Sequence, residues 1–198
     1  MPSETEIKVR LASDEQCSSV LALCKALYSG GLETLQRDEY YDTIEEKLKE
    51  QDLTLRLRSV DGSLKIALKS PRIFLSDKIH QRIELEFSTS DEMELRQQLK
   101  RQNLLATVVI EKRRWTFKCE RAEIVIDKLP FIGFFVEIEG ADPASIEAIL
   151  KSLHLSSDHA VRQNYSELLE AKMLELGLPV RPNLHGTFEV ERQWRERS

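Results

Sequence analysis

The sequence predicts an α+β fold: an eight-stranded antiparallel β-barrel, a tunnel with a charged interior and helices packed outside. About eight segments read as strands, and most are joined by a tight turn or a single helix. Few strand-helix-strand units occur, so a doubly wound parallel sheet is disfavoured. Successive side chains of a strand point to opposite faces, and here one face is repeatedly charged while the other is apolar. Amphipathic helices can cover the apolar faces from outside.

Composition sets the first limits on the protein's class. A chain of 198 residues is expected to form one domain, although two are allowed. The net charge of −5 argues against a nucleic-acid partner bound through phosphate contacts. Apolar runs are too short to span a bilayer and no signal peptide precedes the first strand, so we expect a cytoplasmic protein without a membrane partner. The three cysteines, Cys17, Cys24 and Cys119, lack CxxC spacing and read as buried thiols of a reducing compartment.

The first half of the chain carries four strand signals. In the strand over residues 4–11, apolar residues alternate with four charged ones: Glu4, Glu6, Lys8 and Arg10. Residues 13–28 form a helix with Ser13 or Asp14 as its cap. A strand at 33–41 and a short charged helix at 43–51 follow, and Asp38 and Asp42 fit either the tunnel or a turn. Strands 52–60 and 63–70 form a hairpin about Asp61-Gly62, and Pro71 ends its second strand.

The second half continues the strand-rich pattern. We expect a loop at 75–78, a strand at 79–88, and a helix at 90–102 capped by Ser90. A long strand at 105–118 turns into one at 121–128, a turn covers 129–133, and a strand covers 134–140. Helices follow at 143–153 and 158–176, so residues 1–176 form the domain and 177–198 a polar C-terminal tail. The scattered histidines, His80, His154, His159 and His185, are interpreted as surface or cap residues.

The strands share one charged face, and its members are nearly balanced in sign. The bases on it are Lys8, Arg10, Arg56, Arg58, Lys69, Arg82, Lys112 and Arg114. The acids on it are Glu4, Glu6, Glu84, Glu86, Asp127, Glu137 and Glu139. Solvated sheet faces with cross-strand ion pairs would be the simpler interpretation. The pattern persists on every strand, however, and a closed barrel with the charges inside also removes exposed sheet edges.

Such an interior has a chemical use. Burying this many charges is costly unless they are paired or bind a ligand. Carboxylates without nitrogen or sulfur ligands suit Mg²⁺ or Mn²⁺, and clustered arginine and lysine suit phosphates. Neither a GxxxxGK loop nor a GxGxxG motif occurs, so phosphate would have to be held in another way. The residues therefore predict a tunnel for a metal-bound triphosphate.

At this point the sequence resembles a known family. Glu4-x-Glu6-x-Lys8 resembles the ExExK signature of CYTH proteins, or triphosphate tunnel metalloenzymes, which include class IV adenylyl cyclases, thiamine triphosphatases and inorganic triphosphatases. The other matching segments are Gln36-x-Asp38-x-Tyr40-Tyr41-Asp42-Thr43, Leu55-Arg56-Leu57-Arg58, Leu68-Lys69-x-Pro71, Arg82-x-Glu84-x-Glu86, Lys112-Arg113-Arg114, Asp127 and Gly133-Phe134-Phe135-Val136-Glu137-Ile138-Glu139. Asn164-Tyr165-Ser166-Glu167-Leu168-Leu169 looks like the tail of the cyclase-like branch.

The resemblance implies roles for the charged residues. It implies metal binding by Glu4, Glu6, Asp127, Glu137 and Glu139. It implies phosphate binding by Lys8, Arg10, Arg56, Arg58, Lys69, Lys112 and Arg114. Arg82 either joins this set or only pairs with the acids beside it. Lys8, Glu84 and Glu86 are the catalytic candidates, and the two glutamates either hold a second metal that orients water or tune the neighbouring bases.

Two reactions and one non-enzymatic role stay open. Attack of water on the terminal phosphate of inorganic triphosphate, thiamine triphosphate or ATP is favoured, because no adenine-binding segment is recognisable. Attack of the ribose 3′-hydroxyl on the α-phosphate of ATP would give cyclic AMP, and this needs the base to be held. A polyphosphate-binding module without catalysis is the third reading, and the many carboxylates speak against it. The sequence also leaves a homodimer open.

Overall fold

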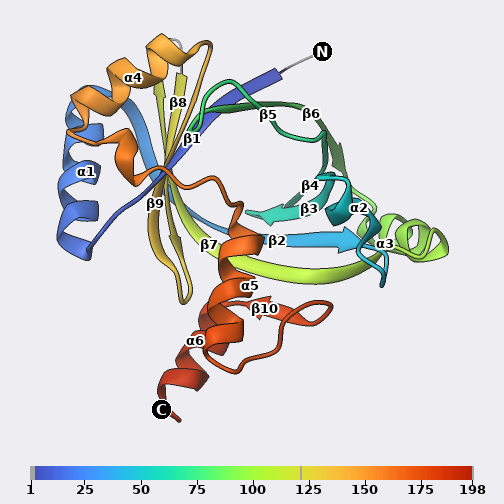
Figure 1. Ribbon diagram of the computed structural model, residues 1–198. Coiled ribbons are helices and arrows are strands. Elements are labelled where there is room, and N and C mark those ends of the chain that lie inside the picture. The colour runs from blue at the N-terminus through green and yellow to red at the C-terminus, as the bar shows by residue number, and fades with distance from the viewer. Residues whose placement is uncertain (1–2, 121, 198) are drawn as a thin grey trace.

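A closed antiparallel barrel of eight strands dominates the structure, a computed structural model that describes residues 3–120 and 122–197 but not the side chains of Ser3 and Glu4. The strands follow one another around the barrel in the order β1-β9-β8-β7-β2-β3-β4-β6, and pairing of β6 with β1 closes the ring (Figure 1). Their bounds are β1 (Ser3–Arg10), β2 (Ser29–Asp42), β3 (Thr54–Val60), β4 (Ser63–Lys69), β6 (His80–Thr89), β7 (Leu105–Cys119), β8 (Ala122–Leu129) and β9 (Gly133–Gly140). The predicted fold class is confirmed.

The helices lie outside this ring. They are α1 (Asp14–Leu27), α2 (Lys47–Glu50), α3 (Glu92–Arg101), α4 (Pro143–Ser152), α5 (Tyr165–Glu175) and α6 (Phe188–Arg195). Of the two predicted caps of α1, Ser13 and Asp14, the structure has Ser13, whereas Asp91 rather than Ser90 caps α3. The single helix predicted over 158–176 is wrong, because a 3₁₀ turn at Ser157–His159 precedes a new start at α5. A capping box formed by Asn164 and Glu167 sets that start.

Two outer cores attach helices to the barrel wall. Helices α1 and α4 pack on the outward residues of β1, β7, β8 and β9, such as Ile7, Phe117 and Ile138, which are fully buried. Helix α3 covers Leu57 of β3. In Figure 1, α1 and α4 accordingly lie together on the opposite side of the barrel from α3. The cover is incomplete on β6, where the outward residues Ile83, Leu85 and Phe87 are exposed.

A third core lies at one end of the barrel itself. Inward residues Val108, Ile110 and Phe135 pack against Leu169 and Met173 of α5. Strand pairing shows that they lie on the inner face, because paired residues share a face: Ile110 lies opposite Asp38, and Phe135 opposite Asp127. The inner face is therefore apolar where α5 closes the barrel and charged beyond it, whereas the sequence predicts a charged interior throughout.

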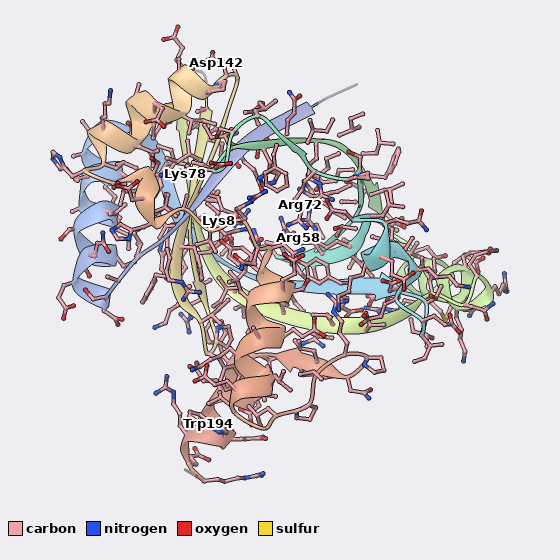
Figure 2. All side chains as sticks on the ribbon, viewed as in Figure 1. Lys8, Arg58, Arg72, Lys78, Asp142 and Trp194 are labelled. Carbon is pink, nitrogen blue, oxygen red and sulfur yellow. The ribbon has the colours of Figure 1, made fainter. Side chains whose placement is uncertain are left out.

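Two short strands extend the ring. Strand β5 (Ile73–Phe74) pairs with β6 where β4 has ended, and β10 (Leu184–Gly186) pairs in parallel with β7. Beyond β10, α6 places Trp194 edge-on to Phe131, with 6.1 Å between the ring centroids, at the lower end of the molecule in Figure 2. Residues after 176 thus pack on the barrel. None of the helices described here is long and apolar enough to cross a membrane.

Candidate active site

The charged inner faces enclose a pocket of about 500 Å³. Eight bases from five strands line it: Lys8, Arg56, Arg58, Lys65, Lys69, Arg82, Lys112 and Arg114. Six acids among the described side chains line it as well: Glu6, Glu84, Glu86, Glu123, Glu137 and Glu139. Tyr40, Thr54, Asn164 and Tyr165 complete the wall, and Figure 2 shows Lys8 and Arg58 reaching into this space. Alternation puts these residues on one face of each strand, and the register places opposite charges side by side, as in Lys8 opposite Glu137.

The deepest part of the basic wall is built around Asp38. Arg58 donates from Nε and Nη2 to the two carboxylate oxygens of Asp38 at 2.6 and 2.8 Å, and Lys112 Nζ lies 3.5 Å from Oδ2. Burial alone would raise the pKa of Asp38, but Arg58 and Lys112 hold it well below its usual range. Burial, together with the guanidinium groups of Arg114 and Arg58, lowers the pKa of Lys112 to about 7. A phosphate bound beside Lys112 would favour its charged form.

A second network joins four strands, β1, β7, β8 and β9. Arg114 donates from Nε to Asp127 at 2.7 Å and from Nη2 to Glu137 at 2.9 Å. Lys8 Nζ lies 3.2 Å from the other oxygen of Glu137. Burial would raise the pKa of Glu137, yet Lys8 and Arg114 lower it strongly. Glu137 therefore fixes two bases that face the pocket.

The opposite wall, on β6, pairs each acid with bases. Glu84 lies 3.2 Å from Arg56 Nη2 and also pairs with Lys69. Glu86 lies 2.8 Å from Lys65 Nζ. Within the described part of the chain the Nε of Arg56 is buried without a hydrogen-bond partner, so it is a donor that an anion in the pocket could use. Arg82, left open above, donates to the backbone oxygen of Ser70 at 2.9 Å and lines the pocket.

Acids gather towards the N-terminal end of β1. Strand pairing sets Glu6 opposite Glu139, and Glu139 opposite Glu123. Burial and the negative charges of Glu6, Glu123 and Glu84 raise the pKa of Glu139 to about 7, which is the mark of carboxylates crowded without enough positive charge. Carboxylate oxygens suit Mg²⁺ or Mn²⁺, so the donor set fits such an ion. No three acidic, histidine or cysteine side chains among those described already stand as a metal site, and the side chain of Glu4 lies outside the described residues.

Three predicted roles need correction or restriction. Arg10 does not line the pocket: it is exposed, donates to the backbone oxygen of Ile132 at 2.9 Å and stacks over Phe135, because the inner face is apolar at that end. Asp127 is completely buried beneath the lining, where Arg114 holds it. His80 is not a surface residue: it is buried, and its Nε2 lies 3.0 Å from Glu6 Oε1.

The structure also decides between the tunnel and turn roles left open for Asp38 and Asp42, and it adds two lining residues that the sequence analysis did not predict. Asp38 is buried behind the pocket lining, where it pairs with the lining residues Arg58 and Lys112. Asp42 is a turn former that accepts hydrogen bonds from the backbone N–H of Thr43, Leu48 and Lys49. Lys65 and Glu123 line the pocket without having been predicted. Each stands four residues from a predicted member of the same strand, Lys69 and Asp127, so the alternation contained the signal.

Comparisons with known proteins agree with this geometry. A model of the CYTH domain matches residues 2–165. A protein of Methanocaldococcus jannaschii named "Putative adenylate cyclase" is 33% identical over 175 residues, which cover 83% of this chain and 97% of that protein. The structure of the PH1012 protein from Pyrococcus horikoshii OT3 superposes with a TM-score of 0.70 at 22% identity, covering 83% of this chain and 98% of that one. HpAC1 from Hippeastrum, named a "putative adenylyl cyclase" with "a dominant triphophatase activity", superposes with a TM-score of 0.64 at 16% identity, over 89% of this chain and 97% of that one.

Proposed function

Because the chain belongs to the CYTH family, we propose that it is a divalent-metal-dependent phosphohydrolase of small triphosphates, inorganic or organic. The observation that carries this proposal is the pocket of about 500 Å³, whose described lining residues include eight bases and six acids. Bases from five strands can bind several phosphates at once, and Arg56 offers a buried Nε that has no hydrogen-bond partner among the residues that the structure describes. A pure polyanion-binding module would have little use for the six acids.

The residues divide by chemistry within the pocket. Lys8, Arg58, Lys112 and Arg114 would neutralise the phosphates in the deep part, because each is oriented by an acid and still faces the pocket. In the structure Glu84 and Glu86 are paired with Arg56, Lys65 and Lys69. We propose that they orient these bases and, when phosphate has taken the bases over, accept a hydrogen bond from the attacking water.

Glu6 and Glu139, with Glu4 of the same strand as Glu6, would hold the metal. A bound Mg²⁺ or Mn²⁺ would supply positive charge that offsets the developing charge on phosphate. Asp127 and Glu137 are occupied by Arg114 and Lys8, so we assign them to orienting bases first. The chain itself binds the phosphates, excludes bulk water through the closed end at α5, and positions the acids.

Cyclisation of ATP is the second candidate, and the name of the Methanocaldococcus jannaschii relative favours it. It requires a site that holds the nucleobase and ribose. The uncharged residues of the pocket are Tyr40, Thr54, Asn164 and Tyr165, and the ring of Tyr165 already faces the ammonium group of Lys8. Hydrolysis needs no base site, and for this reason we place it first.

A substrate panel tests the proposal. Purified protein is incubated with inorganic triphosphate, thiamine triphosphate or ATP and Mg²⁺ or Mn²⁺, and orthophosphate, pyrophosphate and cyclic AMP are measured. We expect orthophosphate, and Arg56→Gln should lower the rate by a factor of about 10². Arg113→Gln is the matched control, since Arg113 points outward beside Arg114 and is exposed. Cyclic AMP and pyrophosphate in equal amounts from ATP, with inorganic triphosphate untouched, would replace the hydrolase by the cyclase.

A further inference from the structure

Tyr165 lies at the boundary between the charged pocket and the apolar closed end. It is the first residue of α5, directly after the capping residue Asn164, and its side chain is buried. Its ring is edge-on to Phe135 with 5.3 Å between the centroids, which ties it to the apolar core beneath. The same ring is part of the pocket wall. Tyr165 therefore forms the floor of the pocket.

The ring of this floor supports two bases from different strands. Lys8 Nζ, from β1, lies 4.4 Å from the ring centroid, and Lys112 Nζ, from β7, lies 5.4 Å from it. The face of an aromatic ring attracts an ammonium group through its quadrupole and carries no net charge. Lys8 already pairs with Glu137 and Lys112 with Asp38, so a further carboxylate in this place would leave the two lysines little positive charge for an anion. The ring holds them while leaving their charge available to an anion.

The hydroxyl group of Tyr165 acts on a third base. It donates to Asp127 Oδ2 at 3.0 Å, and Asp127 in turn accepts from Arg114. Without this donor, Asp127 would be left with Arg114 and the more distant Lys112 Nζ, 3.7 Å away. One side chain outside the barrel strands thus connects Lys8, Lys112 and Arg114.

We propose that Tyr165 is a positioning residue of the phosphate pocket: its ring holds Lys8 and Lys112 in place without neutralising them, and its hydroxyl orients Asp127 against Arg114. The proposal rests on the proposed function, because it takes these three bases to be phosphate ligands. It gives a role in the pocket to a residue of helix α5, which is not one of the barrel strands.

The test separates the ring from the hydroxyl and from packing. Tyr165→Leu removes the ring, Tyr165→Phe keeps it, and Leu169→Ala disturbs the same helix and core at a fully buried position. Binding of inorganic tripolyphosphate is measured by calorimetry in EDTA, which prevents metal-dependent turnover. Loss of two cation–π contacts should raise the Kd of Tyr165→Leu about tenfold. Tyr165→Phe should stay within about threefold of the wild type, because a donor is lost while both contacts remain.

Turnover with Mg²⁺ is then measured on the same proteins. We expect Tyr165→Leu to raise KM for triphosphate more than Leu169→Ala does, after both proteins are shown to be folded by thermal denaturation. Wild-type affinity in Tyr165→Leu would overturn the proposal, and so would an equal loss of affinity in Leu169→Ala. Tripolyphosphate binding without hydrolysis by the wild type would refute the proposed function alone, since the comparison of Kd values would still stand. A wild type that does not bind tripolyphosphate would overturn both.

Discussion

At the scale of single residues, the basic wall of the pocket depends on buried acids that are paired with arginine and lysine. Asp38 is the clearest case, with 1% of its surface exposed and both oxygens bonded to Arg58. Breaking a buried pair by removing one partner is costly, because the other charge stays buried and uncompensated. The same contacts that prepare the pocket for an anion therefore make the fold depend on pH.

Asp38→Asn should lower the free energy of unfolding by about 3 kcal/mol near neutral pH, because Arg58 and Lys112 lose their common carboxylate. The folded-state pKa of Asp38 lies below its unfolded value. Its contribution is thus present above the unfolded pKa and is lost as pH falls through the folded one. Urea unfolding at a series of pH values should show the difference between wild type and variant shrinking below about pH 5.

Glu147→Gln serves as the control for this titration, because Glu147 is exposed on α4. Its unfolding midpoints should follow those of the wild type at every pH. A constant gap between wild type and Asp38→Asn over the acidic range would show that Asp38 does not contribute through its ionised form.

At the scale of elements, strand alternation explains which features of the site the sequence could predict and which it could not. Alternation is local, so it correctly placed Lys8, Glu137 and the bases of β3 on one inner face. It cannot say where along the barrel that face changes from charged to apolar. Arg10 follows the pattern of Lys8, yet it lies opposite Phe135 at the end closed by α5. The neighbours that decide its role are up to 125 residues away in the sequence.

The predictions for His80 and for the start of α5 were wrong for the same reason. His80 has no metal-ligand spacing to another histidine, and only the closure of β6 onto β1 brings it against Glu6. The amphipathic pattern over 158–176 reads as one helix. The chain instead first runs along β1, where Val161 N donates to Lys8 O at 2.8 Å, before Asn164 starts α5. Contacts across the fold override the local pattern at both sites.

Helix α5 is held to the barrel by one arginine that joins three segments. Arg72 follows β4, donates from Nε to Asp52 at 3.1 Å, and donates from Nη2 and Nη1 to the two oxygens of Glu167 at 3.1 and 3.3 Å. Its position between β4 and α5 is marked in Figure 2. Arg72 thereby connects the segment before β3, the segment after β4 and the helix that carries Tyr165.

A double-mutant cycle of Arg72→Gln and Glu167→Gln should give a coupling energy of about 1–2 kcal/mol, because the bidentate bond is charged and partly buried. Urea unfolding of the four proteins measures it, and the cycle cancels the separate bonds of Arg72 to Asp52. The exposed pair of Arg192 and Glu189 on α6 is the control and should show no measurable coupling. Equal results for the two cycles would mean that Arg72 does not hold α5 in place.

At the scale of the whole molecule, the barrel is completed by segments that its strand pattern does not contain. The strands predict the ring and the charged interior, but an inner face that changes to apolar needs a cover at that end. Helix α5 and strand β10 provide it. The sequence predicts the helix but not the end of the barrel that it covers, and it does not predict β10, because their partners on β7 and β9 are brought to them only in the folded protein. The apolar outer face of β6 has no such cover, since Ile83, Leu85 and Phe87 are exposed.

A substitution in β10 (Leu184–Gly186) tests this cover of the barrel end. Leu184 of β10 is fully buried in the core with Val108, Leu169 and Met173, although it lies in the segment that reads as a polar tail. Leu184→Ala should lower the free energy of unfolding by about 3 kcal/mol, because the cavity adds to the lost burial.

For a chain of this size that loss corresponds to a fall of about 6–12 °C in Tm, at about 2–4 °C per kcal/mol. Leu174→Ala on α5 is the control, since Leu174 is 70% exposed, and its Tm should stay close to that of the wild type. Thermal denaturation followed by circular dichroism compares the three proteins. A Tm of Leu184→Ala equal to that of Leu174→Ala would mean that the residues after α5 do not unfold together with the barrel, and that its closed end is stabilised by α5 alone.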